Sequence, residues 1–421
     1  MKTGANKEQE GGCKMKAGNG LTNGMITSGQ AAKLLFLFAL GTAALIVMTT
    51  VVAIAKQDAW ITTLVVAPIN YWFLLIYLKL AERFPDMTLA QYTEKILGKW
   101  LGKALLLLYV FFFVILSALV LRNISDFLVL SILPTTPDWF IAVSFMLVVI
   151  YGTYLGIETI ARTGELLFGG SILLMFIISA LLLNQFHIEN FKPVLYHGWE
   201  QPLKGMYPLI GFPIGEFVVM SMVLPFVRTE DRGKLRKQMK LSIMLIVFFS
   251  FMLSVLLIGV LGVEETMRSP FSIFDMAKTI NVQDVIVRVE VTVAIVWVST
   301  VFSKLILSFY ASALLSAQVL GLKSYRPLIF PIAYFVVPIS LISYRNSAHA
   351  EHFAKIVWTP YSVVMGFIIP LLLLLLAFLT GRKGPKNSAQ PVPTAVETSN
   401  AELAGNAQQS GSGQAGESTP S

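Results

Sequence analysis

Cysteine and charged residues are scarce in this sequence of 421 residues, which holds one cysteine and only 13% charged side chains. A single cysteine, Cys13, cannot form a disulfide framework, and the polar stretch around it gives no indication of a cleaved secretory signal. Soluble domains carry about 25% charged residues, so a soluble globular fold is disfavoured. The sequence also lacks a glycine-rich phosphate loop and the HExxH, CxxC and nucleophile-elbow motifs. We therefore predict no enzyme, no ATP-driven pump, no metal site and no cofactor.

Apolar residues are abundant instead and make up 55% of the chain. They recur in blocks of about 20 residues, each long enough to cross about 30 Å of hydrocarbon as a helix. We predict one all-α integral membrane bundle of about ten crossings. The crossings are expected at 30–54, 59–81, 101–124, 138–157, 165–184, 206–226, 241–263, 286–312, 327–344 and 357–379.

The net charge of +8 reflects topology, because the basic residues fall in the connections between crossings. Most lie on the side shared by the two termini, so both termini are expected in the cytoplasm. The densest basic group follows the sixth crossing and comprises Arg228, Arg232, Lys234, Arg236, Lys237 and Lys240. Residues 26–380 form the predicted membrane domain, and 1–25 and 381–421 are expected to be disordered cytoplasmic tails.

Two sets of five crossings would enter the membrane from opposite sides and form a 5+5 inverted repeat. The first helix of each set should then match, and the sixth crossing is clearly interrupted at Gly211, Phe212, Pro213, Gly215 and Glu216. A helix break in lipid is tolerated only where it is buried in protein or lines a cavity. We predict that this segment is unwound.

The matching segment of the first crossing is a run of small residues: Gly41, Thr42, Ala43 and Ala44. Such a run is compatible with unwinding, but small residues also let membrane helices pack closely. If both helices unwind, their free N–H groups favour a carboxylate and their free carbonyls an ammonium. An amino acid carries both groups.

Few ionisable residues lie inside the predicted crossings. Glu216 is too far from either interface to reach water, so it is a candidate proton site, a ligand for an ammonium, or a structural acid. Lys304 either extends to the interface or takes part in the site. Glu290 is interpreted as a rim charge, and Arg122 with Asp126 as a local pair at i, i+4 spacing.

Aromatic residues mark the predicted ends of the crossings and the outer connections. Five tryptophans are predicted to anchor the bundle at the interfaces: Trp60, Trp72, Trp100, Trp139 and Trp358. The outer segment 264–284 contains Pro270, Phe271, Phe274 and Met276 and is predicted to form a short amphipathic helix over the bundle. Such a cap could close an outer vestibule.

Several runs of the sequence together resemble the endospore germination permeases, the B subunits of spore germinant receptors within the amino acid–polyamine–organocation superfamily. These runs are QDAWIT (57–62), TEKILGKWLGKAL (93–105), NFKPVLYHGWEQPLKG (190–205), FPIGEF (212–217) and SPFSIFDMAKTINVQDVIVRVE (269–290). The resemblance covers residues 26–380. It implies a ten-helix LeuT-type fold in the inner membrane of an endospore, beside a receptor A subunit and a lipoprotein C subunit.

The resemblance also implies where a ligand would bind. The superfamily's substrate site corresponds here to Gly41–Ala44 and Gly211–Glu216, with the third and eighth crossings as walls. The wall residues predicted on these crossings are Phe113, Ser117, Trp297 and Thr300. In sodium-coupled members of this fold a cation bridges the first and eighth helices, and our hypothesis is that Lys304 takes the place of that cation.

Three functions follow from these observations. The first is a receptor subunit that recognises a small germinant of the amino-acid class and triggers germination. The second is a proton-coupled, sodium-independent amino-acid transporter. The third, an ion or water conduit, ranks last because the crossings lack a continuous polar stripe.

Overall fold

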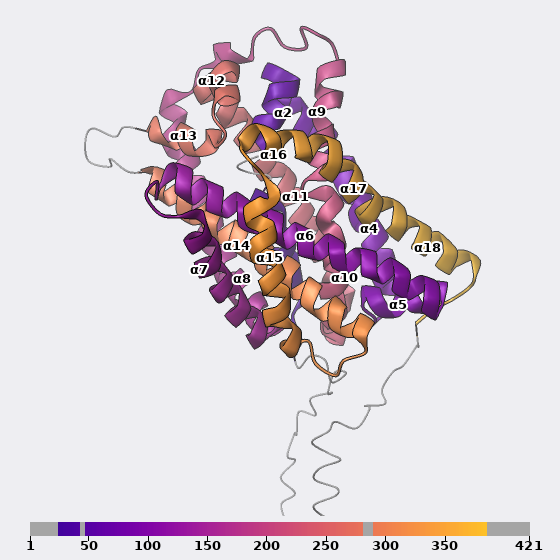
Figure 1. Ribbon diagram of the computed structural model, residues 1–421. Coiled ribbons are helices and arrows are strands. Elements are labelled where there is room, and N and C mark those ends of the chain that lie inside the picture. Colours follow the sequence, from indigo (N-terminus) through magenta and orange to yellow (C-terminus); the bar gives the residue numbers. More distant parts are fainter. Residues whose placement is uncertain (1–23, 43–46, 281–288, 385–421) are drawn as a thin grey trace, which may run out of the picture. The chain divides into compact units, whose positions relative to one another are not determined.

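The computed structural model describes residues 24–42, 47–280 and 289–384 (Figure 1). The predicted tails, 1–25 and 381–421, lie outside these ranges except for 24–25 and 381–384. Ala43, Ala44 and the beginning of the predicted eighth crossing also lie outside them. Within the described part Arg382 donates a hydrogen bond of 2.7 Å to the Lys95 carbonyl, so the chain after the last helix is attached to the bundle.

Helices dominate the first half of the described chain. They are α1 (Ser28–Thr42), α2 (Met48–Ala55), α3 (Ala59–Val65), α4 (Ala67–Arg83), α5 (Leu89–Leu97), α6 (Lys99–Ser131), α7 (Asp138–Leu155) and α8 (Ile157–Leu182). Glycines with positive φ separate consecutive helices where the backbone must turn sharply: Gly98 (φ 85°) precedes α6 and Gly156 (φ 93°) precedes α8.

The second half contains ten further helices among the described residues. They are α9 (Glu200–Gly211), α10 (Met220–Val223), α11 (Arg232–Leu256), α12 (Gly262–Arg268), α13 (Ser272–Lys278), α14 (Val289–Leu320), α15 (Ile329–Ser343), α16 (Ser347–Phe353), α17 (Thr359–Val363) and α18 (Ile369–Leu379). Single wide turns at Leu257–Leu261, Ala354–Trp358 and Val364–Ile368 connect helices without ending them.

Nine helical runs in the described residues are long and apolar enough to cross a membrane, and Ser28–Gly41 is a shorter apolar helix. One run, Met48–Arg83, joins two predicted crossings, because only a tight 3-10 turn at Lys56–Asp58 separates α2 from α3. Lys56 has a φ of 53°, which marks the change of direction. The predicted first and second crossings therefore correspond to α1 with α2 and to α3 with α4.

Several helices extend beyond the predicted crossings. The third crossing, predicted at 101–124, is the 33-residue helix α6. The seventh lies within the longer run Thr229–Arg268. Hydropathy locates hydrocarbon, whereas charged and hydroxyl residues can continue a helix into the interface.

The broken crossings lie at the centre of the packing. Helix α1 packs against α8, α11 and α14, and α6 packs against α14 and α15. The outer segment predicted as one amphipathic helix is two short helices, α12 and α13. Phe271 and Phe274 at α13 each place a ring 5.2 Å from that of Phe127 in α6, so this segment does cover the bundle.

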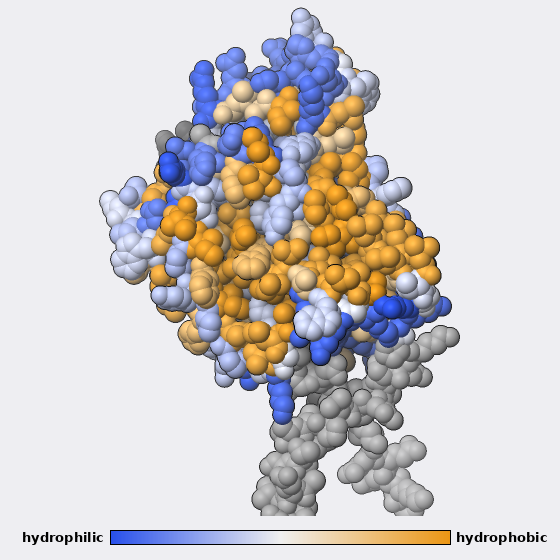
Figure 2. All heavy atoms as spheres, turned by 45° about the vertical axis from the view of Figure 1, so that its right-hand side comes forward, coloured by the Kyte–Doolittle hydropathy of each residue, from blue (hydrophilic) through white to orange (hydrophobic). Residues whose placement is uncertain are grey.

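The outer surface has the polarity of a membrane protein. Figure 2 shows apolar residues gathered across the middle of one face, with hydrophilic residues at both ends. Trp72 and Trp139 are 68% and 58% exposed. A surface that exposes large apolar side chains in a continuous band is stable in lipid and unstable in water.

Candidate functional site

The sixth crossing is unwound where the sequence predicts it. Helix α9 ends at Gly211, and a 3-10 segment from Ile214 to Val219 leads into α10. Pro208, inside α9, and Pro213 both lack a backbone donor, which favours the interruption. The freed backbone groups find partners: the Ser362 hydroxyl donates to the Gly211 carbonyl at 3.1 Å, and the Phe212 amide to the Pro208 carbonyl at 2.8 Å.

The glycines of this break allow the tenth crossing to approach its backbone. A Cβ on Gly211 would lie 2.3 Å from the Thr359 hydroxyl, and one on Gly215 would lie 2.8 Å from the Ser362 hydroxyl. Opposite them, a Cβ on Gly366 would lie 1.7 Å from the Gly215 carbonyl oxygen. The unwound segment is thus held between backbone and short side chains.

Glu216 and Lys304 form a completely buried ion pair at the break, with neither side chain exposed. The Lys304 ammonium contacts Oε2 of Glu216, and the Trp358 indole N–H donates to Oε1 at 3.0 Å. The carboxylate therefore joins the sixth, eighth and tenth crossings. Buried charges are found where they are paired and hydrogen-bonded, because desolvation costs several kcal/mol per ion.

Aromatic rings enclose this pair. The Lys304 ammonium lies 5.0 Å from the ring centroid of Phe38 in α1 and 6.0 Å from that of Phe212. Trp358 stacks on Phe112 of α6 with centroids 5.4 Å apart and planes at 8°. The rings exclude water and stabilise the cation through their electron-rich faces.

The first and eighth crossings meet beside the pair. The Trp297 indole N–H donates to the Gly41 carbonyl at 3.1 Å. A Cβ on Gly41 would lie 2.8 Å from the Thr300 carbonyl oxygen and 3.0 Å from Cβ of Lys304. Gly41 therefore permits close packing, as one of the two interpretations of the small-residue run requires. The interruption itself, between Thr42 and Val47, is outside the described residues.

The predicted wall residues of the third crossing are buried but do not touch the ion pair in the same way. The Ser117 hydroxyl donates to the Phe113 carbonyl at 2.8 Å and shares a 3.1 Å contact with the Ser308 hydroxyl of α14. Phe113 packs against Phe112, at a centroid distance of 5.6 Å. These two residues belong to the packing that supports Trp358.

Two sequence predictions about single residues are corrected by this geometry. Trp358 was predicted to be an interface anchor, but it is completely buried and binds Glu216. Lys304 does not extend to the interface, because its ammonium ends at Glu216 inside the bundle. No local signal distinguishes Trp358 from an anchoring tryptophan, since its partner is 142 residues away.

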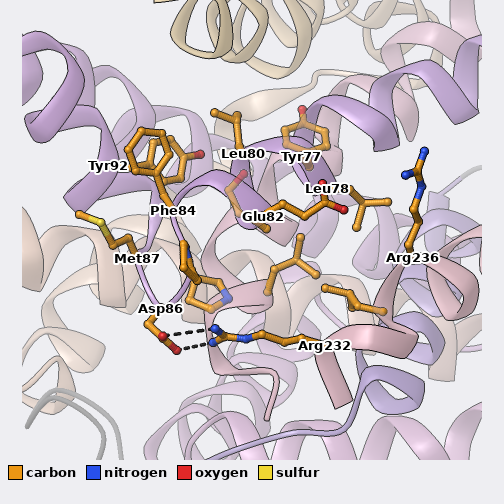
Figure 3. Close-up of a pocket in the computed structure, with 16 residues that line it drawn as sticks. Tyr77, Leu78, Leu80, Glu82, Phe84, Asp86, Met87, Tyr92, Arg232 and Arg236 are labelled. Atoms are coloured by element: carbon orange, nitrogen blue, oxygen red, sulfur yellow. Dashed lines mark hydrogen bonds and ion pairs between the residues drawn. The ribbon is translucent and has the colours of Figure 1, made fainter. Parts of the chain in front are cut away.

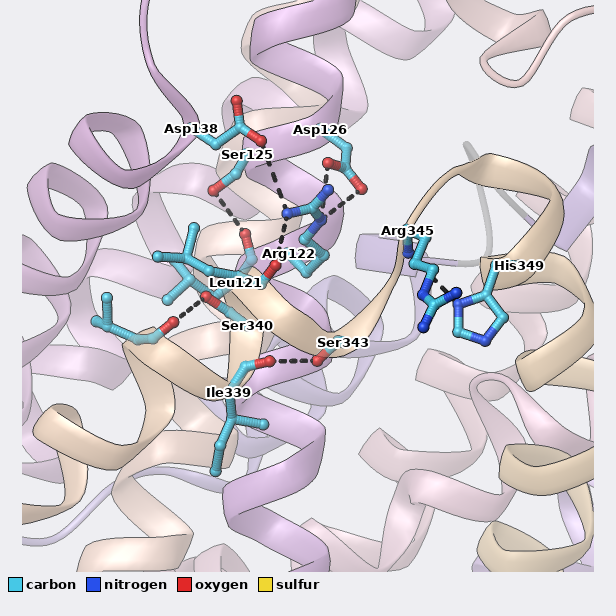
Figure 4. Close-up of polar contacts among 12 residues, drawn as sticks. Leu121, Arg122, Ser125, Asp126, Asp138, Ile339, Ser340, Ser343, Arg345 and His349 are labelled. Atoms are coloured by element: carbon cyan, nitrogen blue, oxygen red, sulfur yellow. Dashed lines mark hydrogen bonds and ion pairs between the residues drawn. The ribbon is translucent and has the colours of Figure 1, made fainter.

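A second polar cluster lies at the far end of α6 (Figure 4). Arg122 forms the predicted pair with Asp126 at 2.8 Å, and it also lies 3.7 Å from Asp138 at the start of α7. Its guanidinium donates to the Leu341 carbonyl in α15 at 3.2 Å. The cluster joins three crossings and is separate from the ion pair.

Comparison with known proteins follows from this architecture. Residues 25–349 match the family described as spore germination protein. The chain is 26% identical over 361 residues to spore germination protein KB of Bacillus subtilis, covering 85% of this chain and 95% of that protein. It is also 26% identical over 301 residues to spore germination protein YndE of the same organism, covering 71% and 82%.

Solved structures share the fold. Mhp1, a nucleobase-cation-symport-1 family transporter solved in a closed conformation, superposes with a TM-score of 0.56 at 14% identity over 87% of this chain and 81% of its own. A manganese transporter from Eremococcus coleocola gives a TM-score of 0.53 at 11% identity over 84% of each chain. These likenesses confirm the predicted LeuT-type bundle. With the family match spanning more than half of its length, the chain belongs to the spore germination protein family of integral membrane permeases.

Proposed function

We propose that this protein is the membrane subunit of a spore germinant receptor that recognises a small germinant of the amino-acid class at its broken helices. It resides in the spore inner membrane with both termini in the cytoplasm, beside a receptor A subunit and a lipoprotein C subunit. Family membership supports the role in germination, and the transporter fold supports a small-molecule site at mid-membrane.

The observation that carries the proposed site is the buried pair of Glu216 and Lys304 beside the unwound segment. A zwitterionic amino acid has the same two charges and can compete for each: its ammonium for Glu216 and its carboxylate for Lys304. Exchange of one ion pair for another keeps every buried charge neutralised. Because the pair links the sixth and eighth crossings, a ligand that separates them favours a different conformation of the bundle.

Lys304 also fits the hypothesis that an ammonium replaces a bound sodium ion. It lies on the eighth crossing, its Cβ lies close to Gly41, and its ammonium faces Phe38 of the first crossing. We expect ligand recognition without sodium. A response that requires sodium would contradict this part of the proposal.

The test is equilibrium binding of the common L-amino acids to the purified chain in nanodiscs, comparing wild type with Glu216→Gln. We expect saturable binding that the substitution weakens. Since Glu216→Gln leaves Lys304 without its carboxylate, the double variant Glu216→Gln with Lys304→Met provides a version without buried charge. Glu165→Gln is the matched control, because Glu165 also pairs with a lysine, Lys33, but is half exposed at a different place. Equal affinity in all four proteins would contradict the proposed site.

The second candidate is a proton-coupled amino-acid transporter, and the transporters that share the fold favour it. It predicts uptake into vesicles that depends on a proton gradient and is lost in Glu216→Gln. A receptor subunit that senses without transport binds the ligand but gives no such uptake. The third candidate, an ion or water conduit, predicts ligand-independent flux.

A further inference from the structure

A separate pocket lies at the end of the bundle that carries the basic group after the sixth crossing (Figure 3). Its cavity volume is about 200 Å³, and it is enclosed by the end of α4, the connection to α5, the region of α10 and the start of α11. Sites for drug-sized ligands occupy roughly 300–1,000 Å³. The pocket therefore suits a smaller molecule.

The inner wall of the pocket has hydroxyl groups that are available to a ligand. Tyr92 is 3% exposed, and its hydroxyl has no hydrogen-bond partner of good geometry among the described residues. Burial raises the pKa of Tyr92 above the ordinary range of tyrosine, with a smaller opposing effect from the Ser221 hydroxyl nearby. Tyr92 is therefore a permanent donor, and Ser221, which is 6% exposed, is a second hydroxyl in the same wall.

The rim of the pocket is charged and balanced. Two acids, Glu82 and Asp86, and two bases, Arg232 and Arg236, line it. Asp86 and Arg232 face each other in a two-point ion pair, with 3.2 Å between the second nitrogen and oxygen (Figure 3). Asp86 reaches this position from a backbone with φ of 64°, which aspartate tolerates better than most residues.

We propose that this pocket is a second small-molecule site, for a zwitterionic amino acid whose ammonium binds Asp86 and whose carboxylate binds Arg232. The Asp86–Arg232 pair opens to admit the ligand, and each charged side chain exchanges one partner for another. An arginine fork matches a carboxylate in two-point geometry. The apolar side chain of the ligand then lies against Leu80, Phe84 and Leu224, and its polar atoms meet the Tyr92 hydroxyl.

This inference rests on the proposed function only for the class of ligand, since the pocket shares no residue with the Glu216 site. Its position on the side of the basic residues assigns it to the cytoplasmic end under the predicted topology. An amino acid bound there is one that has left the central site inward or has arrived from the cytoplasm. Either route makes the pocket sensitive to amino acid on the inner side.

The pocket can be tested by cysteine protection, because the sequence contains only Cys13. In a Cys13→Ser background, Met87→Cys places a half-buried thiol in the pocket wall. Its modification by a small methanethiosulfonate reagent is measured with and without L-valine. Isobutylamine, which lacks the carboxylate, and isovalerate, which lacks the ammonium, serve as single-charge probes. At about ten times the dissociation constant, L-valine should slow modification about tenfold, and the single-charge probes should not.

Charge variants separate this site from the central one. Protection should disappear in Asp86→Asn and in Arg232→Gln, and it should persist in the matched control Arg162→Gln, which removes an exposed i, i+4 pair instead. It should also persist in the double variant Glu216→Gln with Lys304→Met, so failure of the central site would not affect this result. A thiol that cannot be modified, the absence of protection, or protection that survives both Asp86→Asn and Arg232→Gln would overturn the inference.

Discussion

Glu216, Lys304 and Trp358 are the residues on which the proposed site depends. Each belongs to a different crossing, and none is exposed. A carboxylate and an ammonium that share a hydrogen-bonded contact can remain charged inside a protein, whereas either one alone is strongly destabilising. The two charges therefore act as a unit, and substitutions at them should be non-additive.

The first prediction concerns this unit. Lys304→Met alone leaves Glu216 buried without its cation and should reduce the free energy of unfolding by about 3–5 kcal/mol. The double variant with Glu216→Gln should recover much of that loss, because no buried charge is left. Thermal stability in nanodiscs measures both. Equal losses that simply add would show that the two residues do not act as a pair.

The second prediction concerns the hydrogen bond from Trp358 to Glu216. Trp358→Phe keeps a ring that can stack on Phe112 but removes the N–H donor. A hydrogen bond to a charged group contributes about 1.5–3 kcal/mol, so amino-acid affinity should fall roughly tenfold or more. The control is Trp72→Phe, at a tryptophan that is 68% exposed. An affinity within about twofold of wild type would remove Trp358 from the site.

At the scale of elements, the unwound part of the sixth crossing is stable because the tenth crossing lies against it without side chains between them. Tyr77 donates to the Gly366 carbonyl, and Tyr109 donates to the Met365 carbonyl at 2.7 Å. These bonds satisfy backbone groups in the wide turn Val364–Ile368. The two irregular segments therefore stabilise each other in the interior of the bundle.

The third prediction tests this contact. Gly366→Ala would place a Cβ 1.7 Å from the Gly215 carbonyl oxygen, so one backbone must move. Overpacking of this kind costs typically 1–3 kcal/mol, and the melting temperature and amino-acid binding should both fall. Gly170→Ala in α8 is the control, because nothing lies within 4 Å of its Cβ. A Gly366→Ala protein as stable as the Gly170→Ala protein would contradict the close packing.

At the scale of the whole molecule, the tryptophans report the position of the bilayer. Trp72 and Trp139 are exposed on the outer surface, whereas Trp297 and Trp358 are 2% and 0% exposed in the interior. Residues of one type thus divide into two environments, lipid and protein core. Only the outer group can meet a quencher carried by lipid.

The fourth prediction follows from this division. In vesicles of brominated lipid, Trp72→Phe should remove part of the fluorescence that the lipid quenches, since that indole faces the hydrocarbon. Trp297→Phe should leave the quenched part unchanged. Quenching that decreases equally in the two variants would contradict the arrangement of the bundle in the membrane.

The sequence by itself determined the membrane class, the approximate crossings and the break in the sixth helix. Hydrocarbon thickness imposes a repeating apolar length, and glycine with proline interrupts a helix whatever surrounds it. The pattern also singled out Glu216, because an acid at that depth is rare. These are local properties, which residues near one another in the chain specify.

Only the tertiary structure decided which residues meet. Lys304 lies 88 residues from Glu216 and Trp358 lies 142 residues from it, and no periodicity relates such positions. The same reason explains why Lys304 could be interpreted as extending to the interface and Trp358 as an anchor. The pocket at Asp86 and Arg232 also depends on segments 146 residues apart. Contacts of this kind depend on how crossings pack in three dimensions, which hydropathy along the chain does not specify.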